Sequence, residues 1–189
     1  MESLKKKIRQ DAIIRDGNII QVDNFLNHQL DITLLQAIGQ EIYTRFHELN
    51  INKIVTIEAS GIAIAAITAQ YFDNIPVVFA KKKALNQDDT CYQANVFSYT
   101  KKTSYQATIS KRFLNENDRI LIVDDFMANG EAMRGLISLV EQANATICGC
   151  CSIIEKGFQK GGDLLRSDGY PYQSLAIIDK IDENEVTFR

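Results

Sequence analysis

The stretch ILIVDDFMANGEA, residues 120–132 of this 189-residue chain, decides the expected fold. Its first four residues are apolar, a short run typical of a strand buried on both faces of a parallel sheet. Two adjacent carboxylates, Asp124 and Asp125, end the run, and a short loop then leads to a helix expected over 130–144. Ligands of open α/β sheets bind at this carboxyl edge. The stretch therefore predicts a ligand site at the end of a central strand.

The residue types at this edge indicate the chemistry of the ligand. The first N–H groups of a helix have no partner inside the helix, so they attract anions such as phosphate. Asp124 and Asp125 stand beside that helix start and can accept hydrogen bonds from hydroxyl groups. Together these groups suit a ribose phosphate. The alternative is a purely structural role, in which the two carboxylates only end the strand and cap the helix.

A second strand-to-helix loop has the same form. It reads Glu58-Ala59-Ser60-Gly61-Ile62-Ala63 and follows an apolar strand expected over 53–57. Two anion-binding loops at one sheet edge fit a ligand with two phosphate groups. The sequence contains neither G-x-G-x-x-G nor G-x-x-x-x-G-K-[ST], so a dinucleotide-binding fold and a P-loop NTPase are both unsupported.

The rest of the chain continues the alternation of strands and helices. Apolar strands separated by helices are typical of an α/β fold with a parallel sheet core covered on both faces. Strands are expected over 19–22, 53–57, 75–79, 119–123, 145–154 and 174–178, and helices over 62–72 and 130–144. Upstream, Asp31 is the expected N-cap of a helix that runs to Leu49, and a short amphipathic helix from Leu4 ends near residues 16–18.

Residues 81–117 break this alternation. They begin with Lys81-Lys82-Lys83 and a polar loop, and two period-two runs follow around 96–99 and 105–108, with a turn at 101–103. This pattern predicts a flexible loop and an antiparallel hairpin inserted in the α/β core. Such long insertions usually carry function.

Composition bounds the remaining possibilities. Hydrophobic residues make up 46% and charged residues 24%, as in ordinary globular proteins, and one domain over residues 1–189 is expected. The net charge of -3 argues against nucleic acid as a partner. No apolar run approaches the roughly 20 residues of a membrane span, and the basic start lacks the apolar segment of a signal peptide. We therefore expect no membrane partner, a cytoplasmic location and four reduced cysteines.

The Asp124-Asp125 motif, with its apolar lead-in and its Asn129-Gly130 exit, resembles the phosphoribosyl diphosphate (PRPP) motif of type I phosphoribosyltransferases. The resemblance covers essentially the whole chain, including residues 21–29, 58–63 and Glu155-Lys156. This ensemble is most similar to the xanthine-specific members of the family. The family fold that it implies has a parallel sheet flanked by helices, the inserted loop and hairpin, and a small hood built mainly from residues 1–50 and the C-terminal region.

The resemblance also implies an activity and a site. Family members transfer phosphoribose from PRPP to a base nitrogen and release pyrophosphate, with Mg²⁺ bridging diphosphate and ribose oxygens. Asp124 and Asp125 would be the catalytic carboxylates near the ribose hydroxyls and would hold the metal, directly or through water. The 5′-phosphate would lie on Ala128, Asn129, Gly130, Glu131 and Ala132, and the pyrophosphate on Ala59, Ser60 and Gly61. Lys81, or its neighbour Lys82 or Lys83, could supply a cation to the pyrophosphate, from its own chain or across the interface of a homodimer.

The base site separates the subclasses. The ammonium of Lys156 can donate to a purine carbonyl oxygen, whereas the amino group of adenine would oppose it. By resemblance, Ile20 and Asn27 would complete a pocket for xanthine, which makes the expected reaction the salvage of xanthine to xanthosine monophosphate. Two alternatives stay open: a phosphoribosyltransferase for another purine, and a non-enzymatic regulator that senses PRPP. A loop Asp found in hypoxanthine-guanine enzymes is replaced here by Ala128, so no general base is assigned.

Overall fold

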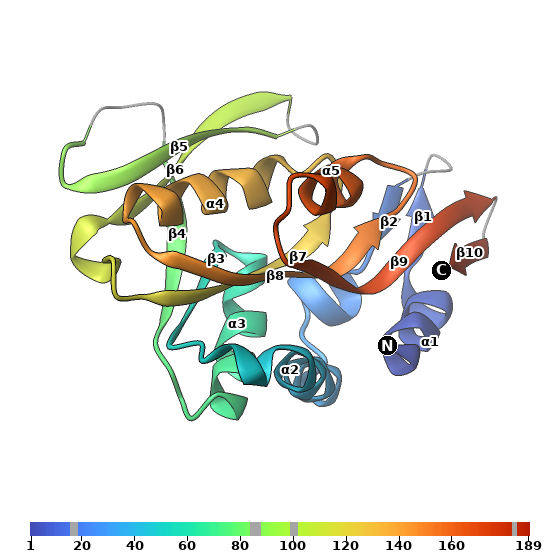
Figure 1. Cartoon of the computed structure of the whole chain (residues 1–189). Coiled ribbons are helices and arrows are strands. Elements are labelled where there is room, and N and C mark those ends of the chain that lie inside the picture. The colour runs from blue at the N-terminus through green and yellow to red at the C-terminus, as the bar shows by residue number, and fades with distance from the viewer. Residues whose placement is uncertain (16–18, 84–87, 99–101, 183–184) are drawn as a thin grey trace.

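The computed structural model describes residues 1–15, 19–83, 88–98, 102–182 and 185–189, and an eight-stranded sheet forms its centre (Figure 1). Five neighbouring strands are parallel, and antiparallel strands flank them at both edges. Across the sheet the order is β10 (Glu185–Phe188), β9 (Tyr172–Asp182), β8 (Thr146–Lys156), β7 (Arg119–Met127), β3 (Lys53–Ile57), β4 (Val77–Lys83), β6 (Thr103–Ser110) and β5 (Cys91–Ser98). The parallel core matches the α/β fold expected from the sequence.

Helices cover both faces of this sheet, as Figure 1 shows. On one face lie α2 (Ile32–Phe46) and α3 (Ser60–Tyr71), and on the other lie α4 (Glu131–Gln142) and the short α5 (Gly161–Ser167), while α1 (Glu2–Asp11) packs beside β9 and β10. Successive residues of β7 alternate between the two cores: Leu121 and Val123 pack in the core with α2 and α3, and Ile120 and Ile122 pack with α4. This alternation explains why the strand is apolar at every position from Ile120 to Val123.

The N-terminal segment folds over the end of the sheet. A two-stranded antiparallel sheet of β1 (Ile13–Arg15) and β2 (Ile19–Gln21) precedes a single π-helical turn, η1 (Asp23–Asn27). Phe25 and Leu26 of this turn are fully buried in the core beside α2, so the turn is fixed in place. Asp31 caps α2 as expected, since its Oδ1 accepts a hydrogen bond from the Leu34 N–H at 3.0 Å.

Several boundaries differ from the sequence expectations. The helix α1 ends at Asp11, before the expected end near 16–18, which lies outside the described residues. It stops because Ala12 is extended and the following Ile13 and Ile14 pair with β2. The strand β7 does not end before the two carboxylates but continues through Asp124 and Asp125 to Met127, because β8 pairs with it as far as Glu155. The strands β1 and β10, the turn η1 and the helix α5 were not expected.

The inserted hairpin is confirmed and extends the main sheet. Its strands β5 and β6 pair from Cys91 with Ser110 to Ser98 with Thr103, and β6 also pairs with β4 at Lys81–Lys83. That pairing lengthens β4 beyond the expected end at Phe79. The hairpin also packs on α4, where Gln142 exchanges two hydrogen bonds with the backbone of Gln93, at 2.9 and 3.2 Å. Residues 84–87 of the polar loop lie outside the described residues, as do residues 99–101, which include the first position of the turn expected at 101–103.

Among the described residues, no helix has the length and apolar character needed to cross a lipid bilayer.

Candidate active site

The two carboxylates of β7 occupy different environments. Asp124 is only 3% exposed, and its Oδ1 accepts a hydrogen bond from the Asp125 N–H at 2.9 Å. Burial, reinforced by the neighbouring negative charge of Asp125, raises the pKa of Asp124 well above its usual value. Asp125 is half-buried instead. The pair therefore presents one desolvated carboxylate and one that faces the surface of the site.

Asp125 also contacts the N-terminal segment. The side-chain amide of Asn27, at the end of η1, donates a hydrogen bond to Asp125 Oδ2 at 3.3 Å, and the Phe126 N–H donates to Oδ1 at 2.9 Å. Asn27 and Asp125 are 98 positions apart in the sequence. The buried residues of η1 hold Asn27 at this point, so the structure brings together a residue expected to bind the base and one expected to bind the ribose.

A cavity of about 420 Å³ opens beside this contact. Its lining includes Ile20, Asn27, Asp125, Phe126, Ala128 and Lys156. Lys156 is the last residue of β8 rather than a residue after the strand, and burial lowers the pKa of its ammonium group. All three residues expected for the base pocket, Ile20, Asn27 and Lys156, therefore line one cavity next to Asp125.

The expected 5′-phosphate loop lines an adjoining cavity of about 180 Å³. Residues 128–132 form one wall, and Phe126 and Ala128 border both cavities. Gly130 precedes α4 with a φ of 92°, a left-handed conformation that favours glycine. Because α4 begins at Glu131, its free N–H groups lie at this wall. The arrangement offers a phosphate site directly beside the base cavity.

The second loop lies at the same sheet edge, next to the first. The strand β3 pairs in parallel with β7, with Val55 opposite Ile122, so the loop after Ile57 begins level with the carboxylates. The Glu58–Ala59 peptide bond is cis, and Ser60 is the first residue of α3. A Cβ atom at Gly61 would lie 1.9 Å from Thr56 Oγ1, so only glycine allows the helix to approach β3 this closely.

The three lysines of β4 do not face the same way. Lys82 lines the cavity of the phosphate loop, where its Nζ lies 5.3 Å from the centre of the Tyr105 ring. Lys81 and Lys83 line a separate cavity of about 190 Å³ on the other side, together with Phe79 and Phe113. The structure therefore brings Lys82, and not Lys81, to the site of its own chain. Period-two alternation from the buried Ala80 is the signal in the sequence that could have separated them.

Other residues of the site carry little sequence signal. Tyr105 lies on the hairpin and lines the phosphate cavity; burial, followed by the charge of Asp124, raises the pKa of its hydroxyl to about 12. Phe126 lines both cavities. Both are distinguishable from core aromatics only by the neighbours that the fold gives them.

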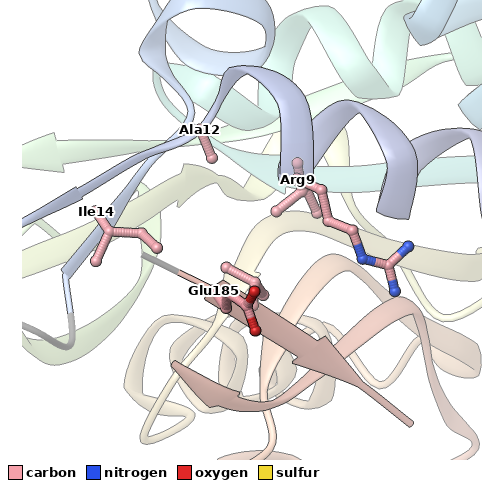
Figure 2. A pocket seen from close by; sticks show the side chains of 6 residues that line it. Arg9, Ala12, Ile14 and Glu185 are labelled. Atoms are coloured by element: carbon pink, nitrogen blue, oxygen red, sulfur yellow. The ribbon is translucent and has the colours of Figure 1, made fainter. Parts of the chain in front are cut away.

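A further cavity, of about 350 Å³, lies away from this edge between α1, β1 and β10. Figure 2 shows its lining, with Arg9 and Ala12 from the α1 end, Ile14 from β1 and Glu185 from β10. Among the residues that the structure describes, its lining has none in common with the three cavities above. None of the residues singled out from the sequence lies there.

The donor set at the sheet edge suits magnesium rather than a softer metal. Within the described ranges, no group of three or more His, Cys, Asp or Glu side chains could hold a metal by itself. Asp124 and Asp125 supply carboxylate oxygens, and Asp124 is buried beside another negative charge. Mg²⁺ is usually bound by one or two carboxylates together with water and substrate phosphates, so these two residues fit that mode.

Comparison with known proteins shows the family of the chain. A family model described as "Phosphoribosyl transferase domain" matches residues 21–189. The chain is 53% identical to "Xanthine phosphoribosyltransferase 1" of Clostridium perfringens over the full length of both, and 54% identical to "Xanthine phosphoribosyltransferase" of Alkaliphilus metalliredigens over all of this chain and 94% of that one. Among solved structures, adenine phosphoribosyltransferase of Saccharomyces cerevisiae is 22% identical, with a TM-score of 0.73 over 93% of this chain and 99% of that one.

The chain belongs to the phosphoribosyltransferase family, and its fold is that of the type I enzymes. This confirms the family and the fold class expected from the sequence. Members of the family can use different bases, and the candidate cavity for the base is the one lined by Asn27 and Lys156.

Proposed function

We propose that this chain is a xanthine phosphoribosyltransferase, which transfers the 5-phosphoribosyl group of PRPP to xanthine and gives xanthosine 5′-monophosphate and pyrophosphate. The observation that carries the proposal is the cavity that joins Lys156 and Asn27 to Asp125 beside the phosphate loop. Relatives named xanthine phosphoribosyltransferase that are about half identical over the whole chain support it. The role of such a reaction is purine salvage.

The chemistry of the cavity favours an oxopurine. A lysine ammonium has only donors, so it pairs with a carbonyl oxygen and opposes an amino group. The Asn27 side chain offers both a donor and an acceptor, which suits the alternating edge of xanthine. Ile20 is buried, at the wall of the cavity, and gives the base an apolar contact. The solved adenine enzymes share the fold at low identity, so the fold itself does not select the base.

PRPP would extend along the sheet edge from this cavity. The backbone N–H groups of residues 128–132 would hold the 5′-phosphate, and those of 59–61 the pyrophosphate. Asp124 and Asp125 would lie beside the ribose hydroxyls and hold Mg²⁺, directly or through water. Lys82 is the cation that the same chain can offer to the pyrophosphate, whereas Lys81 would serve a partner subunit.

Catalysis in this arrangement rests on position and charge. As the bond to pyrophosphate breaks, positive charge develops on the ribose ring and negative charge on the leaving group. The Asp124 and Asp125 carboxylates stabilise the former, and the helix N–H groups and Lys82 stabilise the latter. Bound magnesium supplies further charge neutralisation at the diphosphate. No general base is assigned to a side chain.

The assembly and the location are also proposals. We expect one domain over residues 1–189, a homodimer and a cytoplasmic enzyme. The face of β4 that turns away from α4 exposes Phe79 beside Lys81 and Lys83, and Phe113 lies next to it, which supports a contact between copies there. Light scattering at micromolar concentration tests the dimer, and a monomeric mass would refute it.

The proposed reaction is tested with wild-type protein, PRPP and Mg²⁺ by ultraviolet absorbance, with xanthine, hypoxanthine, guanine and adenine offered separately. We expect clear preference for xanthine. Turnover of another base would leave the family and fold unchanged and would assign a different base specificity. Absence of turnover in a protein that still binds PRPP would indicate a sensing role, and salt-sensitive binding to purine promoter DNA would support that role.

A further inference from the structure

A buried carboxylate lies behind the candidate site, outside the residues assigned to substrates. Glu155 is the penultimate residue of β8 and is 1% exposed. Its two oxygens accept hydrogen bonds from both terminal nitrogens of Arg166, at 2.6 and 3.0 Å. The hydroxyls of Tyr172, at 3.3 Å, and Ser174 also donate to it. The pair is therefore a two-pronged ion pair with a fully satisfied carboxylate.

This ion pair is in direct contact with the start of α5. A Cβ atom on Gly162 would lie 2.1 Å from Glu155 Oε1, so the helix backbone rests on the carboxylate. One residue earlier, the Gly161 N–H donates a hydrogen bond to the Ala128 carbonyl oxygen at 3.0 Å. A Cβ atom on Gly161 would lie 2.4 Å from that carbonyl oxygen. The first two residues of α5 thus lie between Glu155 and the first residue of the phosphate loop.

The loop meets the start of α5 at a second point as well. Gly130 also lies against Gly161, whose Cα would be 3.3 Å from a Cβ at Gly130. No side chain caps the start of α4. The backbone of α5 is therefore in contact with both Ala128 and Gly130 of the loop, and on its other side with Glu155.

We propose that Glu155 and Arg166 are positioning residues for the 5′-phosphate: their ion pair fixes the start of α5, and Gly161 in turn fixes the loop that binds the phosphate. The inference rests on the proposed function. Glu155 is buried, whereas the Arg166 side chain is 35% exposed. Burying a charge in an ion pair contributes little to stability compared with apolar residues of the same size, so we assign the pair a geometric role. Lys156 follows Glu155 in β8 and faces the other side, into the base cavity, so the base is expected to be little affected.

The test is a comparison of KM values in the full-length enzyme. We expect Arg166→Met to raise the KM for PRPP about tenfold, because a small misplacement of a binding group has large effects, and to change the KM for xanthine much less. Arg166→Lys, which keeps the charge and loses the two-pronged geometry, should restore part of the loss. A matching rise in the dissociation constant of ribose 5-phosphate, measured by calorimetry without catalysis, should accompany the change in KM.

Arg134→Met is the matched control. Arg134 forms an exposed ion pair at 2.6 Å with Asp168, which directly follows α5 and so stands at the opposite end of that helix from Gly161 and Gly162. We expect wild-type KM values for both substrates. Should Arg166→Met fail to fold, the double substitution Glu155→Gln and Arg166→Met, which removes both charges, carries the same expectation.

Three results would overturn the inference. An unchanged KM for PRPP would show that the loop does not depend on the pair, and equal losses for both substrates would indicate general loosening. A larger rise in the KM for xanthine than in the KM for PRPP would show that the ion pair positions Lys156 instead of the phosphate loop. If the wild-type protein converted none of the offered bases with PRPP, the proposed function itself would be refuted. That result is distinct from all three.

Discussion

Replacing Asp124 with asparagine should separate activity from stability. The side chain is 3% exposed, and burial and the adjacent Asp125 both oppose its negative charge. Asparagine has nearly the same shape, and its carbonyl oxygen can still accept the hydrogen bond that the Asp125 N–H donates at 2.9 Å. Asp124→Asn therefore removes the charge and leaves the local packing in place.

The expected change in the stability of Asp124→Asn follows from the burial of the side chain and from the sign of its pKa shift. Removing an unfavourable buried charge from a functional site commonly adds about 0.5–2 kcal/mol of stability. For a chain of this size each 1 kcal/mol corresponds to roughly 2–4 °C in Tm, so a rise of about 1–8 °C is expected at pH 7. The pKa of Asp124 is raised in the folded state, so the folded form binds the extra proton and the wild type loses stability as the pH rises through that range. Near its usual pKa of 3.8 and below, the advantage of the variant should disappear.

Thermal denaturation at pH 7 and pH 4, together with steady-state turnover, measures both effects. Turnover should fall by about 10² to 10³, the usual cost of losing one electrostatic contact to a transition state. Asp118→Asn is the control, since Asp118 is buried but paired with Lys53 at 2.7 Å, and its loss should cost about 1–3 kcal/mol. Wild-type turnover in Asp124→Asn, or a Tm loss as large as that of Asp118→Asn, would refute the reasoning.

Three further predictions concern the base, the loop and the cation. Lys156→Ala should raise the KM for xanthine far more than the KM for PRPP. Because burial lowers the lysine pKa from 10.5, the ammonium loses its proton as the pH rises through a value under 10.5, and kcat/KM for xanthine should fall with it. Lys156→Arg should remove this fall. Gly130→Ala should lower Tm and PRPP affinity, since a left-handed φ of 92° costs a side-chain residue about 1–2 kcal/mol; unchanged calorimetric binding of ribose 5-phosphate would contradict this. Lys82→Ala should weaken inhibition by pyrophosphate in the site of its own subunit. Lys81→Ala should weaken it only if the Lys81 side chain reaches the site of a partner subunit. Mixed dimers of each lysine variant with an Asp125→Asn protein can distinguish these two cases.

Local sequence patterns were sufficient for much of the fold. The apolar run before Asp124 predicts a strand covered on both faces, and alternate residues of β7 do pack into the two cores. Asp31 predicts the start of α2 because an N-cap needs only the next three residues. The boundaries were less accurate where pairing with a distant strand decides the end, as in β4, which β6 extends to Lys83.

The sequence by itself determined the family resemblance and the residues expected to meet a ligand: two carboxylates, two loops with the form of anion sites, and a lysine suited to an oxopurine. Only the tertiary structure decided how these residues lie together. It brought Asn27 to Asp125 across 98 positions, turned Lys82 rather than Lys81 toward the phosphate loop, buried Asp124, and placed Glu155 and Arg166 behind α5. The reason is physical: capping and periodicity act over a few residues, whereas these contacts depend on strand order and on helices packed between them.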